Sequence, residues 1–215
     1  MITENTPNVI TKEHLAKAMD YNAYVALTEQ LLAENKTTGT NHSADLVEYT
    51  RMNLHRMRRG EKATVLTDQM LDALKGIERK MVWVVITEAW CGDAAQNLPA
   101  IAKIAAASPL IELKLLLRDE HLDVMDAYLT NGGRSIPKLI ALDAETLEEL
   151  GTWGPRPEPA QQLVLDAKAR QMDFKEMAER LHGWYGKDRG QTLQQEFIPL
   201  LRSWEKAEAT IANRN

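Results

Sequence analysis

The sequence predicts an α/β fold, because segments typical of buried strands alternate with segments typical of helices from about residue 63 onward. The run from Met81 to Ile86 is continuously apolar and rich in valine, which is typical of a strand buried on both faces. A helical pattern over residues 92–107 then leads to a second apolar run at residues 111–117. Helical patterns also precede and follow this alternation, so additional helices are expected at both ends.

The N-terminal segment has apolar residues at helical spacing after a candidate N-cap at Thr11. These residues are Leu15, Met19, Tyr24, Leu27 and Leu31. A polar break covers residues 35–41. Ser43 is expected to cap a second helix that ends near Gly60.

The alternating part begins with a short strand expected at residues 63–66, followed by a helix capped by Thr67. The strand through Ile86, the helix over residues 92–107 and the strand at residues 111–117 come next, and we expect the last of these to be shielded from water on both faces. A helix over residues 121–129 is stopped by Asn131-Gly132-Gly133.

The third strand is expected over residues 135–142, with Pro137 near its start, where a missing N–H is tolerated. A turn at residues 143–145 leads into residues 147–152, which predicts a hairpin. After Pro159 the pattern is helical to the end of the chain, with breaks near Asp173 and at residues 186–190.

Composition excludes several classes of protein. The 26 basic and 31 acidic residues give a net charge of -5, which disfavours a general nucleic-acid binder. One cysteine excludes an intramolecular disulfide. Because no apolar run approaches the ~20 residues of a membrane helix and no apolar core follows a basic start, we expect a cytoplasmic protein without a membrane partner. The five histidines show no metal-ligand spacing, so no metal is expected.

The lone cysteine, Cys91, lies between the buried strand and the following helix, within the sequence Trp90-Cys91-Gly92-Asp93. A helix N-terminus favours thiolate over thiol, because it offers free N–H groups and a partial positive charge. The negative charge of Asp93 opposes this effect, so the net change in the thiol pKa is expected to be small. A reactive thiol here predicts an alkylation midpoint below the free-cysteine value of ~8.5. The alternative is a buried cysteine that acts as a small hydrophobic residue.

The thiol between strand and helix, Pro99 eight residues later and Ile136-Pro137 at the start of a later strand together resemble the thioredoxin-like superfamily, whose motif is Trp-Cys-Gly-Pro-Cys. The resemblance covers about residues 62–170. It implies a thioredoxin-like fold, a mixed central sheet with helices on both faces, with N-terminal and C-terminal helices added. The implied units are an extension over residues 1–60, the domain over 61–170 and an extension over 171–215. Bacterial branches of the superfamily carry Cys-Gly-Asp in this way.

Two departures from the thioredoxin pattern change the expected chemistry. Ala94 stands where thioredoxins have the second cysteine, so the internal attack that resolves a mixed disulfide cannot occur. Val85 stands where they keep a buried carboxylate that accepts a proton from that cysteine. The dithiol cycle is therefore not available to this chain.

The resemblance implies that Cys91 is the catalytic residue and that a substrate groove surrounds it. Pro137, in the cis form, would place the backbone of Ile136 beside the thiol, where related proteins pair with an extended peptide. The groove residues are Trp90, Gly92, Asp93, Ile136, Pro137, Trp153, Gly154 and Arg156, with Gly151 as an alternative to Gly154. Arg156 would hold a substrate carboxylate, with Arg118 and Arg134 near the same rim. For each arginine, a solvated surface position is the favoured alternative.

The leading hypothesis is a monothiol thioredoxin-like protein that performs thiol-disulfide exchange or deglutathionylation on a protein or small-molecule substrate. It needs no cofactor beyond an external low-molecular-weight thiol. The alternative is a non-catalytic binding module with a degenerate site. Iron-sulfur assembly is disfavoured, because the Cys-Gly-Phe-Ser motif of monothiol glutaredoxins is absent. The basic cluster at residues 51–59 is interpreted as a solvated helix face, and His182, Trp184 and Tyr185 as residues that pack a terminal helix onto the core.

Overall fold

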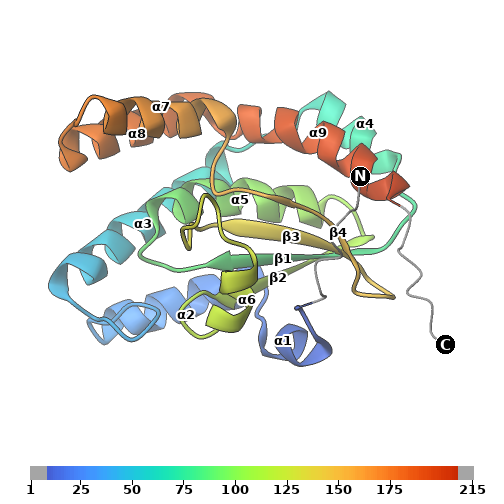
Figure 1. Ribbon diagram of the computed structural model, residues 1–215, viewed down its shortest axis with the longest axis horizontal. Coiled ribbons are helices and arrows are strands. Elements are labelled where there is room, and N and C mark those ends of the chain that lie inside the picture. Colours follow the sequence, from blue (N-terminus) through green and yellow to red (C-terminus); the bar gives the residue numbers. More distant parts are fainter. Residues whose placement is uncertain (1–8, 208–215) are drawn as a thin grey trace.

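A computed structural model describes residues 9–207 and has a mixed four-stranded sheet at its centre (Figure 1). The strands are β1 (Met81–Thr87), β2 (Ile111–Leu117), β3 (Lys138–Asp143) and β4 (Glu149–Trp153), in the order β2-β1-β3-β4. β1 pairs with β2 in parallel and with β3 antiparallel, and β3 and β4 form the expected hairpin. The α/β thioredoxin-like fold is confirmed.

Helices cover both faces of the sheet because the side chains of β1 alternate between two cores. Trp83 and Val85 pack in the core formed with α5 (Gly92–Ala106), α4 (Asp68–Lys75) and α9 (Gln191–Lys206). Val84 and Ile86 pack in the opposite core with α6 (Leu122–Ala127), and α1 (Lys12–Lys17) lies against it. Figure 1 shows α5 and α9 on one side of the sheet and α1 and α6 on the other. All seven residues of β1 are buried, as the sequence predicts.

The part of the N-terminal extension before residue 35 contains two helices where the sequence predicts one. Thr11 caps α1, and α2 (Tyr21–Ala33) begins after Asp20, whose carboxylate accepts the Ala23 N–H at 2.8 Å. The chain breaks between them because Met19 pairs with Leu115 of β2 through two backbone hydrogen bonds of 3.0 and 2.8 Å. Strand pairing at a sheet edge therefore overrides the helical spacing.

The prediction of a strand at residues 63–66 is wrong. Helix α3 (Ala44–Ala63) starts after Ser43, whose side chain makes no capping bond, and it continues three residues beyond Gly60. The segment after it is bound by a side chain of α9, because the Gln194 amide donates to Val65 O at 3.1 Å and accepts the Thr67 N–H at 2.8 Å. These backbone groups are thus satisfied without a neighbouring strand.

Three further boundaries differ from expectation. β2 is not shielded along its whole length, because it is an edge strand and Glu112 in its first half is exposed. α6 ends at Ala127, two residues short of the prediction. β3 begins at Lys138, so Ser135 to Pro137 precede it.

The C-terminal part is helical over the residues that the structure describes, with α7 (Glu158–Ala169), α8 (Phe174–Asp188) and α9. Asp173 marks the expected break and caps α8. The second break falls at Arg189 and Gly190, which adopt left-handed backbone angles, so α8 runs through Gly186. The prediction of helix beyond residue 207 lies outside the described residues. Across residues 9–207, none of the helices has the length and apolar character that a membrane crossing requires.

Candidate functional site

Cys91 occupies the N-cap position of α5, directly after the strand that carries the chain into the site. Its Sγ donates a hydrogen bond to the backbone oxygen of Ile136 at 3.3 Å. The Ile136–Pro137 peptide bond is cis, and both residues are buried. The backbone N–H groups of Asp93 and Ala94 also act on the sulfur and favour its thiolate. The fold thus joins the thiol to the proline segment 45 residues later.

Burial raises the pKa of the Cys91 thiol to about 12, and the negative charge of Asp93 adds to this increase. The backbone N–H groups and the more distant Arg156 lower it, but they do not offset the first two effects. The hydrogen bond to Ile136 also requires the proton on sulfur. The sequence-based expectation of a small net change is therefore wrong, and the thiol is protonated at neutral pH.

Asp93 lies at the centre of a buried hydrogen-bond network. Its Oδ1 accepts the Tyr185 hydroxyl at 2.8 Å, and its Oδ2 accepts from Arg156 Nη2 at 2.5 Å. The Asn97 amide donates to Asp93 O at 2.8 Å and to the Tyr185 hydroxyl at 3.0 Å. Burial and the charge of Asp93 raise the pKa of Tyr185, which keeps that hydroxyl a donor. Three elements, α5, α8 and the loop after β4, meet in this network.

Arg156 differs from one of the two expectations made for it. Its side chain is 17% exposed, so the solvated-surface alternative is wrong. Its two terminal nitrogens bind Asp93 and Gln161 Oε1, the latter at 2.9 Å, while its buried Nε has no hydrogen-bond partner among the described residues. The geometry gives Arg156 the role of neutralising the buried charge of Asp93.

Helix α8 closes over the first residue of α5. A Cβ added at Gly92 would lie 2.8 Å from Cε1 of His182, so a side chain at this position would displace the histidine. His182 Nδ1 contacts the Gln96 amide at 3.1 Å. Burial, followed by the charge of Arg56, lowers the pKa of His182 to about 4. The interpretation of His182 and Tyr185 as packing residues missed that they pack against the motif itself.

Trp90 and Arg118 form the opposite rim of the site. The Arg118 guanidinium carbon lies 4.7 Å from the centre of the Trp90 ring, which is a cation-π contact. Arg118 also donates to Arg134 O at 3.4 Å, while the Arg134 side chain forms a two-bonded pair with Asp126. Arg118 therefore lies beside the site as predicted, and the backbone oxygen of Arg134 contacts Arg118.

Trp153 does not flank the groove. Its ring is buried edge-to-face against Phe197 of α9, with ring centres 5.2 Å apart, and its Nε1–H donates to Glu196 at 2.8 Å. Gly154 has the predicted place beside the proline segment. A Cβ there would lie 2.3 Å from Pro137 O, and the φ of +114° also favours glycine. Gly151 instead faces the Trp204 indole.

Glu88 is a buried carboxylate that the sequence reasoning missed. It is fully buried three residues before Cys91, and burial raises its pKa. Its Oε1 accepts the Asp119 N–H at 2.8 Å, whereas its Oε2 has no partner within the described residues. The sequence signal was a charged residue directly after a buried strand.

The family model described as "Thioredoxin" matches residues 39–173, which is more than half of the chain. The chain belongs to the thioredoxin family. Among curated proteins, none matches it. A crystal structure of a Pseudomonas aeruginosa protein of unknown function has a TM-score of 0.61 at 20% identity, covering 89% of this chain and 96% of that one. An HIV epitope-scaffold gives a TM-score of 0.59 at 20% identity, with the same coverage of 89% and 96%. These likenesses show the fold alone.

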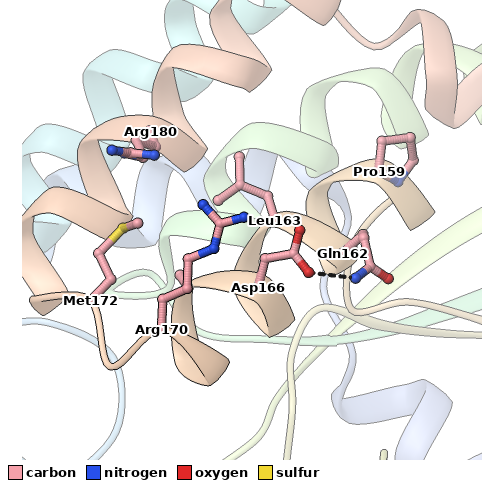
Figure 2. A pocket seen from close by; sticks show the side chains of 8 residues that line it. Pro159, Gln162, Leu163, Asp166, Arg170, Met172 and Arg180 are labelled. Carbon is pink, nitrogen blue, oxygen red and sulfur yellow. Dashed lines mark hydrogen bonds between the residues drawn. The ribbon is translucent and has the colours of Figure 1, made fainter.

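Two cavities lie near the helices that this thioredoxin-family chain carries at its C-terminal end. One, of about 230 Å³, is bordered by Asn97 and Tyr185 of the Asp93 network. The other, of about 370 Å³, lies between α7 and α8, where Figure 2 shows Arg170 beside the hydrogen-bonded pair Gln162 and Asp166. None of the residues that line the second cavity contributes to the network around Cys91.

Proposed function

We propose that the protein performs thiol-disulfide exchange or deglutathionylation through Cys91 as a single nucleophile. The observation that carries the proposal is the position of the sulfur, at the N-cap of α5 and 3.3 Å from Ile136 O. That position puts the thiol where an incoming chain extended along the Ile136 backbone would meet it. We infer the reducing cytoplasm as the setting, because it supplies external thiols.

The raised pKa of Cys91 indicates that the substrate itself activates the thiol. The bond to Ile136 O stabilises the protonated form, and a hydrogen bond to the neutral form of a group raises its pKa. A peptide N–H that binds Ile136 O would remove this acceptor from the thiol. The N–H groups of Asp93 and Ala94 remain and favour the thiolate. The thiol would then become reactive in the complex rather than in the free protein.

The proposed reaction has two exchange steps. Cys91 loses its proton to solvent, and the thiolate attacks one sulfur of a substrate disulfide, which forms a mixed disulfide and expels the other sulfur as a thiolate. An external thiolate of the glutathione class then attacks the mixed disulfide. It forms a new disulfide with the substrate sulfur and returns Cys91 to the free thiol. The cycle consumes one disulfide and forms another, so one external thiol balances it and the thiolate expelled in the first step takes up a proton from solvent.

Trapping of the mixed disulfide tests this proposal. The purified protein is incubated with glutathione disulfide and with a glutathionylated peptide, quenched with acid and examined by intact mass spectrometry. We expect an adduct on Cys91 that forms faster with the peptide than with glutathione disulfide, and no adduct in Cys91→Ser. Equal absence of adducts from both substrates over hours at pH 8 would refute the proposal.

A binding module without turnover is the second candidate, and the bond from Cys91 to Ile136 favours it. In that role the thiol serves as a hydrogen-bond donor that orders the proline segment. Cys91→Ala would then retain partner binding while losing only some stability. If Cys91→Ala and wild type pull down the same partners from a lysate and complement a deletion equally, the binding module replaces the exchange reaction.

A further inference from the structure

Three side chains with metal-binding atoms meet on the face of the sheet covered by α1 and α6. They are His14, His121 and Asp123, and one ligand atom from each lies within 4.8 Å of the others. His14 Nε2 is 3.0 Å from Asp123 Oδ2, and the two imidazole rings are edge-to-face with centres 5.6 Å apart. His14 comes from α1, whereas the other two residues begin α6.

We propose that these three residues bind a divalent first-row transition metal, with zinc as the reference ion. Two imidazoles and a carboxylate suit zinc and its neighbours better than magnesium or calcium, which prefer oxygen ligands. Three protein ligands leave a position for water. The sequence showed no metal-ligand spacing because the fold alone joins residues that lie more than a hundred positions apart. The proposal is independent of the reaction at Cys91.

An ion pair alone does not account for this cluster. It explains the contact between His14 and Asp123, but it gives no role to His121, whose ring nitrogens make no hydrogen bond among residues 9–207 and are not among the fully buried atoms that lack a partner. Solvent therefore reaches this ring. An incoming ion can reach it together with the exposed Asp123 carboxylate.

The surroundings of His14 can support metal binding through its Nε2. Its Nδ1 accepts the Thr11 N–H at 3.1 Å and lies 3.1 Å from Thr11 Oγ1. Metal binding at Nε2 would move the ring proton to Nδ1, which exchanges the bond from the Thr11 N–H for one to the Thr11 hydroxyl. Zinc–nitrogen distances of about 2.0 Å place tetrahedral ligands about 3.3 Å apart. The cluster therefore has to contract by about 1.5 Å from its widest spacing of 4.8 Å. Asp123 is 64% exposed and can rotate to allow this.

The test is a zinc titration by calorimetry in Cys91→Ser, which removes the thiol as a competing ligand. We expect one ion per chain, with affinity at least tenfold lower in Asp123→Asn and in His121→Asn. His55→Asn, on the exposed face of α3, is the matched control and should bind like the parent. Because Asp123 is exposed, its variant keeps the fold even where the His121 variant does not, and circular dichroism checks both.

Cobalt provides a second measurement that reports the ligands directly. We expect visible d–d bands of a four- or five-coordinate site, which vanish in Asp123→Asn and persist in Cys91→Ser. Saturable binding with unchanged affinity in both Asp123→Asn and His14→Ala would overturn the proposal. Absence of zinc binding to Cys91→Ser at concentrations up to 1 mM would also overturn it, because a dissociation constant above 1 mM corresponds to a binding free energy weaker than about -4 kcal/mol.

Discussion

The two terminal extensions contact the thioredoxin domain in different ways. The N-terminal extension adds backbone pairing at the edge of β2 through Met19, and its Tyr24 hydroxyl makes only a long contact of 3.5 Å with Thr87. The C-terminal extension sends Tyr185 of α8 to the residue two positions after Cys91, with a 2.8 Å hydrogen bond to Asp93. The N-terminal extension also holds the backbone of Ala89, two residues before the thiol, through the Asn53 amide and the Thr38 hydroxyl, each at 2.9 Å. It therefore supports the sheet and the backbone before Cys91, whereas the C-terminal extension binds the charged side chain after it.

This difference shows how the α8 extension is compatible with an acidic residue beside the thiol. A buried carboxylate needs a cation or several donors, and Arg156 and Tyr185 provide them, while Asn97 donates to the Tyr185 hydroxyl. In return the charge of Asp93 raises the pKa of Cys91. The C-terminal extension therefore helps to fix the protonation state of the only thiol. The predictions below separate this role from ordinary packing.

The largest effect is expected from Arg156→Ala. It leaves the Asp93 carboxylate buried without its cation, which costs about 3–5 kcal/mol in the free energy of unfolding. Arg134→Ala breaks a pair whose side chains are 48% exposed and should cost less than about 1 kcal/mol. Urea unfolding at pH 7 measures both. Equal losses would show that the Asp93 network has no special importance.

Removal of one hydroxyl from each extension gives the next test. Tyr185→Phe leaves Asp93 Oδ1 without its donor and should cost about 1–3 kcal/mol. Tyr24→Phe removes a 3.5 Å contact and should cost less than about 1 kcal/mol. Thermal and urea unfolding of the two variants measure these losses of stability. A larger loss in Tyr24→Phe than in Tyr185→Phe would contradict the contrast between the extensions.

The pH dependence of stability tests the burial of His182. Its pKa is lowered to about 4, so between roughly pH 6.5 and 4 the unfolded chain binds a proton that the folded chain does not. The free energy of unfolding therefore falls as the pH falls through this range, by up to about 1.4 kcal/mol per unit from this group. His182→Gln should flatten the slope, while the exposed His55→Gln leaves it unchanged. If the free energy of unfolding of His182→Gln had the same pH dependence as that of the wild type, His182 would be solvent-exposed in the folded protein.

The smallest effect is expected from Thr11→Ala in the N-terminal extension. The Thr11 hydroxyl accepts the His14 N–H at the start of α1, and losing this cap costs about 0.5–1 kcal/mol. Because α1 supports the sheet and does not reach the thiol, the alkylation profile of Cys91 should not change. A shifted profile would show that α1 also acts on the site.

The sequence predicted the elements that position the thiol better than the contacts that surround it. Local sequence patterns predicted β1, α4, α5 and the hairpin. Features such as the apolar run from Met81 and the α4 cap at Thr67 depend only on nearby residues. The breaks at Met19 and at Val65 depended on partners far along the chain, and no local pattern showed them. The pairing of Arg156 with Asp93 was not predicted for the same reason, since the two residues lie 63 positions apart.

The protonation state of Cys91 is the central claim, and the pH dependence of its alkylation by iodoacetamide tests it most directly. Burial and the charge of Asp93 raise the pKa of this thiol to about 12. The alkylation rate should therefore rise without a plateau up to pH 10, which is about 1.5 units above the free-cysteine pKa of ~8.5. Removal of the charge in Asp93→Asn should lower the midpoint. A wild-type midpoint below ~8.5 would contradict the account.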